Sequence, residues 1–151
     1  MANITHVIGV KANQDEVFNA VTDTQGLAQW WTNDVSGSGK AGGTLRFRFN
    51  GEGPDMKVVA ANTDRVEWEC VSGPEEWLGT QIVFDIRRDT KETEIYFQHN
   101  GWAIESPFHY HCSMKWAVFM LSLKDYLDSG QGKAFPNDIH INTSNCYGHL
   151  M

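Results

Sequence analysis

Residues 107–129, PFHYHCSMKWAVFMLSLKDYLDS, decide the fold. Large apolar side chains recur in this stretch at intervals of three and four, the repeat of an amphipathic helix. The stripe consists of Phe108, Cys112, Trp116, Phe119, Leu123 and Leu127, and Met120 and Leu121 widen it. Gly130 follows at the position where a left-handed residue commonly ends a helix. The pattern predicts one long helix with a continuous apolar face that must be buried.

Upstream of this helix the apolar period changes to two, which is typical of strands with one buried face. The stretches with this period are TLRFRFN (44–50), MKVVAAN (56–62), RVEWECV (65–71), TQIVFDIRR (80–88) and TEIYFQHNG (93–101). Short polar turns separate them. This order predicts an antiparallel meander with one dry face and one wet face.

The N-terminal part predicts one more strand and two short helices. NITHVIGVKA (3–12) is rich in β-branched residues, as strands are. Asn13 and Glu16 have the spacing of a capping box, so a helix is expected to begin there, and a second short helix is expected from about Thr24. NDVSGSGKAGG (33–43) is expected to interrupt regular structure.

Together these elements predict an α+β fold in which a curved antiparallel sheet wraps round the long C-terminal helix. A sheet with one apolar face must be covered, and only this helix is large enough to cover it. We expect a single domain over residues 1–136 and a polar tail over 137–151. The Asn-rich C-terminal stretch is expected to lie along the surface or fray, with Phe135 and Ile139 available to pin it.

Composition restricts the classes of function. The net charge of −7 and pI near 5.2 argue against a nucleic-acid partner, which requires an excess of Lys and Arg. Three widely spaced cysteines form no disulfide framework and suit a reducing compartment. The N-terminus does not read as a signal peptide, and no apolar run approaches the roughly 20 residues of a membrane span. We therefore expect a soluble, cytoplasmic protein.

Several motifs resemble, in order, those of AHSA-type proteins, the relatives of the C-terminal domain of the heat-shock protein 90 ATPase activator. They are DEVFNAVTDTQGLAQWW (15–31), the Gly42-Gly43 pair, RVEWEC (65–70), GTQIVFDI (79–86), FQHNGW (97–102) and HYHCSMKWAVFMLSLKDYLDSGQG (109–132). The resemblance implies the helix-grip fold of the SRPBCC superfamily, also called START-like or Bet v 1-like. It also implies an apolar cavity between the sheet and the helix.

The candidate cavity residues follow from the inward positions of this fold. They are His99, Trp30, Trp31, Phe47, Phe49, Trp68, Trp77, Phe84, Phe97, Trp102, Trp116, Phe119 and Met120. His99 is either a core histidine satisfied by hydrogen bonds or a polar group that orients a ligand. One of the adjacent pair Trp30 and Trp31, and Trp77 in its loop, are candidates for the cavity rim.

Three residues at the start of the long helix could suggest a metal site. His109 and His111 are two positions apart and point to different sides of a helix, so both cannot reach one ion. His109 and Cys112 alone are too few ligands for structural zinc. In AHSA-type relatives the pattern His109, Cys112, Ser113 is not generally read as metal-binding. We expect a satisfied histidine at a helix start, with no metal and no cofactor.

The leading interpretation is a protein that binds a small hydrophobic or aromatic molecule between the sheet and the long helix. A protein–protein module of the chaperone activator type is the first alternative, with a chaperone as partner. A cyclase-like or hydratase-like enzyme that uses His99 as acid–base residue is the second, although no catalytic motif is present. The sequence leaves monomer and homodimer open.

Overall fold

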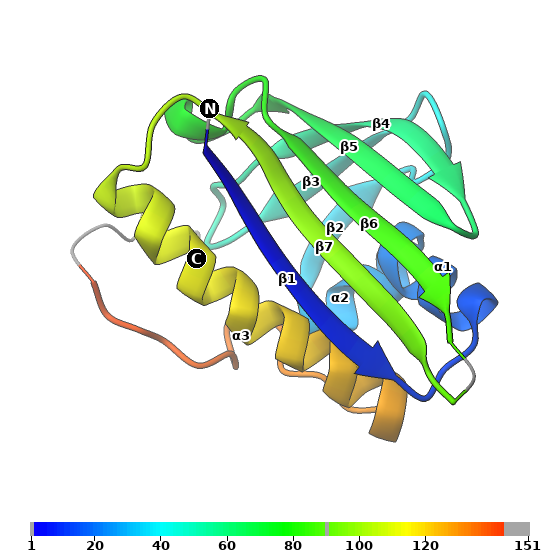
Figure 1. Ribbon diagram of the computed structural model, residues 1–151. Helices are drawn as coiled ribbons and strands as arrows, with labels where there is room; N and C mark the ends of the chain where they lie inside the picture. Colours follow the sequence, from blue (N-terminus) through cyan, green and yellow to red (C-terminus); the bar gives the residue numbers. More distant parts are fainter. Residues whose placement is uncertain (1, 90, 144–151) are drawn as a thin grey trace.

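A computed structural model describes residues 2–89 and 91–143. In chain order the elements are β1 (Ala2–Val10), α1 (Gln14–Thr22), α2 (Thr24–Trp30), β2 (Asp34–Gly37), β3 (Thr44–Arg48), β4 (Asp55–Asn62), β5 (Arg65–Ser72), the 3-10 turn η1 (Glu75–Trp77), β6 (Gln81–Arg88), β7 (Thr93–Trp102) and α3 (Pro107–Ser129). Figure 1 shows these elements as a curved sheet with α3 along one side of it.

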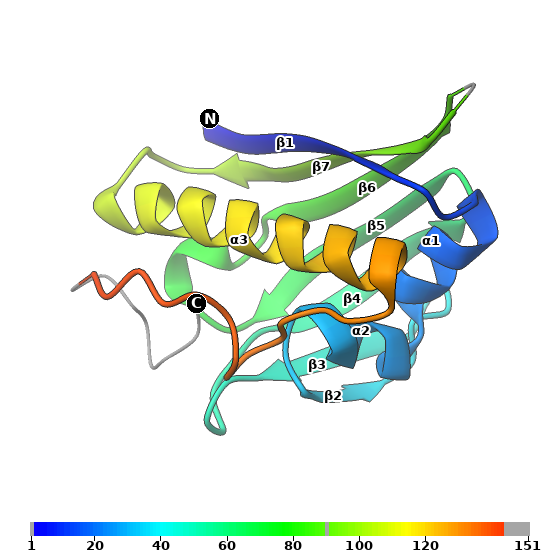
Figure 2. The ribbon, with the colours of Figure 1, turned by 90° about the horizontal axis from the view of Figure 1, so that it is seen from below.

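Within the described residues the strands form one antiparallel sheet in the order β1-β7-β6-β5-β4-β3-β2. The sheet curls, so that α3 lies between its two edges and faces its concave side (Figure 2). The inward residues of β7, which are Ile95, Phe97 and His99, are buried and alternate with more exposed neighbours, as their period of two predicts. The predicted helix-grip architecture is confirmed.

Local signals fix the ends of the helices. The Asn13 side chain accepts a hydrogen bond from the backbone N–H of Glu16, and the Glu16 carboxylate accepts one from the backbone N–H of Asn13, which completes the capping box of α1. Ser106 caps α3 by accepting from the backbone of His109. Gly130 ends α3 with φ +86°, the left-handed conformation that costs glycine little.

Two predictions at the level of elements were wrong. Residues 34–37 form strand β2 at the edge of the sheet, where we expected irregular structure, and they pair with β3 from Asp34↔Arg48 to Gly37↔Leu45. This edge strand is short and largely exposed, so it carries no apolar alternation that could reveal it. Leu121 does not widen the buried stripe of α3, because its side chain is 58% exposed.

The segment after α3, residues 131–143, is attached to the domain at defined points. The backbone of Phe135 donates to the carbonyl of Trp31 and accepts from the N–H of Asn33. Phe135 is buried, as expected of a pinning residue, whereas Ile139 is 62% exposed. Asp138, inside the expected polar tail, is buried against α3. Residues 144–151 of that tail lie outside the described residues.

Candidate functional site

All candidate cavity residues lie in the interior, each at most 1% exposed. The burial includes Trp30, Trp31 and Trp77, so the expected rim position of a tryptophan is wrong. The turn η1 ends at Trp77, whose ring lies 4.7 Å from that of His99 and 6.0 Å from that of Trp116.

The rings contact one another between the sheet and α3. Trp31 lies 4.2 Å from Phe47 and 4.9 Å from Trp116, measured between ring centroids. Trp116 also lies 4.5 Å from Phe97 and 6.0 Å from Trp77. We call this group the aromatic cluster; it consists of the candidate tryptophans and phenylalanines with His99. Trp116 of α3 is the central ring of the cluster, because it contacts both Trp31 on one side and Trp77 on the other.

His99 is held by hydrogen bonds on both ring nitrogens. The indole N–H of Trp116 donates to Nδ1 at 3.1 Å, so Nδ1 is the acceptor and Nε2 carries the proton. Nε2 then donates to Thr80 Oγ1 at 2.8 Å, and that hydroxyl donates onward to the carbonyl of Trp77. The chain of bonds fixes one neutral tautomer, as for a satisfied core histidine.

The same environment opposes a charge on His99. Burial, and secondarily the proximity of His109, lowers its pKa from 6.5 to about 3. An imidazole with this pKa stays neutral at physiological pH, and both of its nitrogens already have partners. This arrangement does not favour His99 as an acid–base residue.

Other polar atoms of the interior are left without partners. Within the described part of the chain, four buried indole nitrogens form no hydrogen bond: those of Trp31, Trp68, Trp77 and Trp102. Trp31 and Trp68 stack at 6.3 Å, and Trp77 and Trp102 meet edge to face at 6.4 Å. Trp116 contacts a member of each pair, so the unpartnered donors lie on both sides of it. Composition reveals the tryptophans but not which of their N–H groups lack acceptors.

The two histidines at the start of α3, where we expected a satisfied histidine, differ from each other. His109 is 6% exposed, its ring lies 4.9 Å from that of Trp102, and neither of its nitrogens has a hydrogen-bond partner among the described residues. His111 Nδ1 instead forms a hydrogen bond with the Thr143 hydroxyl. In residues 2–89 and 91–143 no three His, Cys, Asp or Glu side chains are grouped to hold an ion.

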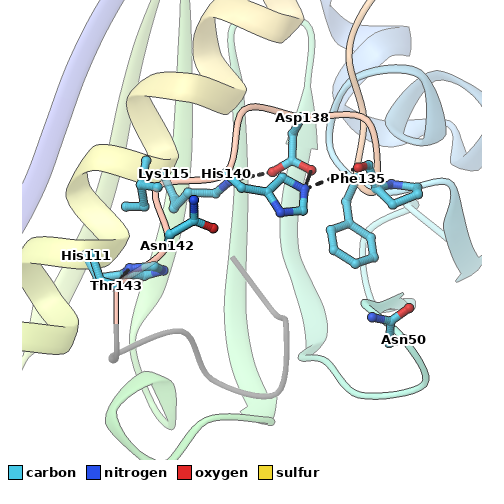
Figure 3. A pocket seen from close by; sticks show the side chains of 10 residues that line it. Asn50, His111, Lys115, Phe135, Asp138, His140, Asn142 and Thr143 are labelled. Carbon is cyan, nitrogen blue, oxygen red and sulfur yellow. Dashed lines mark hydrogen bonds and ion pairs between the residues drawn. The ribbon is translucent and has the colours of Figure 1, made fainter.

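A separate pocket of about 400 Å³ opens between α3 and the C-terminal segment (Figure 3). Its lining residues are Asn50, His111, Lys115, Phe135, Pro136, Asp138, His140, Ile141, Asn142 and Thr143. Lys115 and Asp138 form an ion pair there, with side chains only 2% and 1% exposed. The Lys115 ammonium also donates to the carbonyl of Ile139 at 2.7 Å. These contacts attach the segment to α3.

Sequence reasoning missed this pocket and its ion pair. Lys115 is the only charged residue between positions 107 and 123, next to the buried-stripe residue Trp116. A lone lysine beside an apolar stripe is a signal for a buried, paired cation. No sequence pattern identifies Asp138 as its partner, because a loop brings the two together.

Other cavities lie outside the aromatic cluster. One of about 520 Å³ is lined by α1, α2 and the end of α3, and one of about 440 Å³ by β1 and β7. Among the candidate residues, only Phe97 contributes to the lining of the three cavities named here. Each ring of the aromatic cluster is at most 1% exposed, so the cluster is closed in this structure.

A curved antiparallel sheet that grips a long C-terminal helix, with an aromatic interior, defines the helix-grip, START-like class of proteins. Residues 11–128 match the model of the family described as Activator of Hsp90 ATPase homolog 1-like protein. The chain belongs to this family, within the SRPBCC superfamily. No curated protein matches it. No helix in the described part of the chain is long and apolar enough to cross a membrane.

Solved structures share the fold. One is the solution structure of the Aha1 dimer from Colwellia psychrerythraea, 46% identical, covering 87% of this chain and all of that one, with a TM-score of 0.81. DynU16, from the dynemicin biosynthetic locus, is 25% identical over 86% of this chain and 48% of that one, with a TM-score of 0.70. SSP2350 from Staphylococcus saprophyticus is 15% identical over 88% of this chain and 97% of that one, with a TM-score of 0.73, and shows the fold alone.

Proposed function

We propose that the chain binds a small, flat aromatic molecule that carries hydrogen-bond acceptors, between the sheet and α3. The observation that supports the proposal is the set of buried indole N–H groups without acceptors, on Trp31, Trp68, Trp77 and Trp102. A buried donor without a partner costs roughly 1–3 kcal/mol. A ligand with carbonyl or hydroxyl oxygens recovers this energy when it accepts hydrogen bonds from the indoles. Its own rings then pack against the protein rings that move apart to admit it.

The closed aromatic cluster sets a condition on this proposal. Trp116 contacts both pairs of unpartnered tryptophans, so a ligand that reaches either pair must displace rings next to Trp116. Binding then changes the environment of several tryptophans at once. His99 is not a candidate contact in this proposal, because both of its nitrogens already have partners.

The experiment is a screen of aromatic and lipid compounds by tryptophan fluorescence and ligand-observed magnetic resonance, on wild type and two matched variants. Trp68→Phe removes an unpartnered N–H, whereas Trp30→Phe removes an N–H that donates to the Ala20 carbonyl at 2.8 Å. Both remove the same part of an indole ring from a fully buried site.

A ligand that accepts from the Trp68 indole is expected to bind about tenfold more weakly to Trp68→Phe, since one net hydrogen bond contributes roughly 1 kcal/mol. Trp30→Phe is expected to change that affinity less than threefold or so. Binding only above about millimolar, or equal effects of the two variants, counts against the proposal. In that case these indole N–H groups do not select a ligand.

A second candidate function is interaction with an Hsp90-class chaperone by a homodimer of the chain. It is favoured by the family match over residues 11–128 and by the 46% identical relative described as an Aha1 dimer. The test is the ATPase rate of the purified chaperone of the same source with increasing amounts of this protein. A several-fold increase at micromolar concentration supports the activity, and an unchanged rate up to about 100 µM rejects it.

A further inference from the structure

We propose that the outer face of α3 is the surface on which a second copy of this chain docks. The inference rests on the homodimer of the second proposed function. The outer face of α3 means Tyr110, Met114, Ala117, Val118 and Leu121, which point away from the sheet. It lies between β1 on one side and the C-terminal segment on the other, and nothing described covers it (Figure 2).

This face is apolar although it faces solvent. Tyr110 is 60% exposed, Met114 56% and Leu121 58%, and the side chains of Ala117 and Val118 are half-buried. Their spacing of three and four residues places them in one row, at the repeat that two packed helices require. An exposed apolar row on a helix is typical of an interaction surface.

From Tyr110 to Leu121 the face carries no charge. Between positions 107 and 123 the only charged residue is Lys115, and its side chain is 2% exposed and turned to Asp138. The whole chain has a net charge of −7, so two copies repel each other over most of their surfaces. The outer face of α3 is a place where two copies can meet without bringing like charges together. This favours a second copy on this face over a charged partner protein.

The row is self-complementary in an antiparallel arrangement. In two copies related by a two-fold axis, residue i of one copy faces residue j of the other, and residue j faces residue i. The two residue numbers of every facing pair therefore have the same sum. With the axis between Ala117 and Val118, Met114 faces the partner's Leu121. Tyr110 then faces the partner's Asp125, where its hydroxyl can donate to an exposed carboxylate. The small side chain of Ala117 lets the two helices approach closely at the axis.

The size of the face predicts a dimer of modest affinity. From Tyr110 to Asp125 the helix rises about 22 Å, at 1.5 Å per residue. One pair of helices of this length belongs at the small end of stable interfaces. A dissociation constant in the micromolar range is therefore expected.

Sedimentation velocity over a range of concentrations tests the surface. Leu121→Glu puts two charges near the axis and is expected to raise the dimer dissociation constant at least about thirtyfold. Val59→Glu and Val71→Glu are matched controls, because these valines are 50% and 48% exposed on strands β4 and β5. Both controls are expected to stay within about threefold of wild type, since they lie away from the contact.

A cysteine at the axis tests the antiparallel geometry. Ala117→Cys, in a Cys146→Ser background that removes a native thiol outside the described residues, is expected to form a disulfide-linked dimer on mild oxidation. Val59→Cys in the same background is the control and is expected to stay monomeric on reducing-agent-free gels. Equal cross-linking of the two variants overturns the geometry.

The outcomes separate this inference from the function on which it rests. If the wild type stays monomeric at about 100 µM, both the proposed homodimer and the proposed docking surface are wrong. A dimer that Leu121→Glu leaves intact keeps the homodimer and overturns the docking surface. A dimer that Leu121→Glu breaks, while chaperone stimulation is absent, supports the surface and rejects the chaperone activity.

Discussion

The indole N–H of Trp116 donates a hydrogen bond to Nδ1 of His99 across 3.1 Å, and this bond joins α3 to strand β7 inside the aromatic cluster. A bond of this kind requires a neutral imidazole, because a protonated Nδ1 has no lone pair to accept with. The protonation state of His99 is therefore coupled to the packing of the helix on the sheet.

Stability is expected to depend on His99 at acid pH. In the unfolded chain this imidazole titrates near 6.5, whereas burial lowers its pKa in the folded chain to about 3. Between these two pH values the unfolded state binds the extra proton, so the contribution of His99 is complete above pH 6.5 and is lost as the pH falls towards 3. The expected slope from this residue is at most about 1.4 kcal/mol per pH unit.

The measurement is denaturant unfolding of wild type and His99→Gln from pH 4 to pH 7.5. His99→Gln is expected to be less stable at pH 7 and to lose the slope that His99 contributes. His6→Gln, on the edge strand β1, is the control. Parallel stability curves for wild type and His99→Gln mean that His99 is not the group that titrates.

The Lys115–Asp138 pair is expected to hold the C-terminal segment. Lys115→Met leaves the Asp138 carboxylate buried without its cation, which costs roughly 3–5 kcal/mol unless the segment is released. Lower unfolding stability, or rapid proteolysis within residues 131–143, is the expected result. The double variant Lys115→Met with Asp138→Leu is expected to recover most of the stability, because apolar residues replace a buried pair well.

Lys124→Met is the comparison for this pair. Lys124 also forms an ion pair, with Asp128, but its side chain is 37% exposed. Exposed pairs contribute about 0–1 kcal/mol, so this variant is expected to stay near wild type. Equal losses for Lys115→Met and Lys124→Met contradict a special role of the buried pair.

Cys70 is expected to be unreactive in the folded protein. Burial raises the pKa of its thiol to about 12, and Sγ donates to the carbonyl of Ser72 at 3.3 Å. Since the thiolate is the reactive species, alkylation by iodoacetamide at pH 8 is expected to be about a thousandfold slower than for an exposed cysteine. Mass spectrometry of the peptide that contains Cys70, in native buffer and in denaturant, measures this ratio. Labelling at similar rates in both conditions contradicts the burial.

The sequence predicts the fold because α3 and the central strands carry strong and different apolar periods. The inward row Ile95, Phe97, His99 and the stripe of α3 are both found where their periods place them. β2 could not be predicted, since a short edge strand buries too little to show alternation. Leu121 was misassigned because it lies next to the stripe in sequence and points away from it on the helix.

The burial of the candidate residues could be predicted from the sequence, but their hydrogen bonding could not. Inward strand positions identify the rings, but a sequence does not show which N–H groups find an acceptor. Trp30 reaches the carbonyl of Ala20 because α1 and α2 meet at that point, and Trp68 reaches none. Lys115 and Asp138 are 23 residues apart and meet through a loop that has no periodic pattern.

This difference between Trp30 and Trp68 predicts opposite hydrogen-bonding effects on stability. Trp30→Phe leaves the Ala20 carbonyl without its donor, which adds about 1 kcal/mol or more to the cost of the smaller ring. Trp68→Phe removes a buried donor that has no acceptor, so the loss of its desolvation penalty offsets part of the same packing cost. Trp30→Phe is therefore expected to be the less stable variant by about 2 kcal/mol in urea unfolding. If Trp68→Phe proves equally or more destabilising, its indole N–H has a partner in solution, and ligand-free protein already satisfies the donor on which the binding proposal depends.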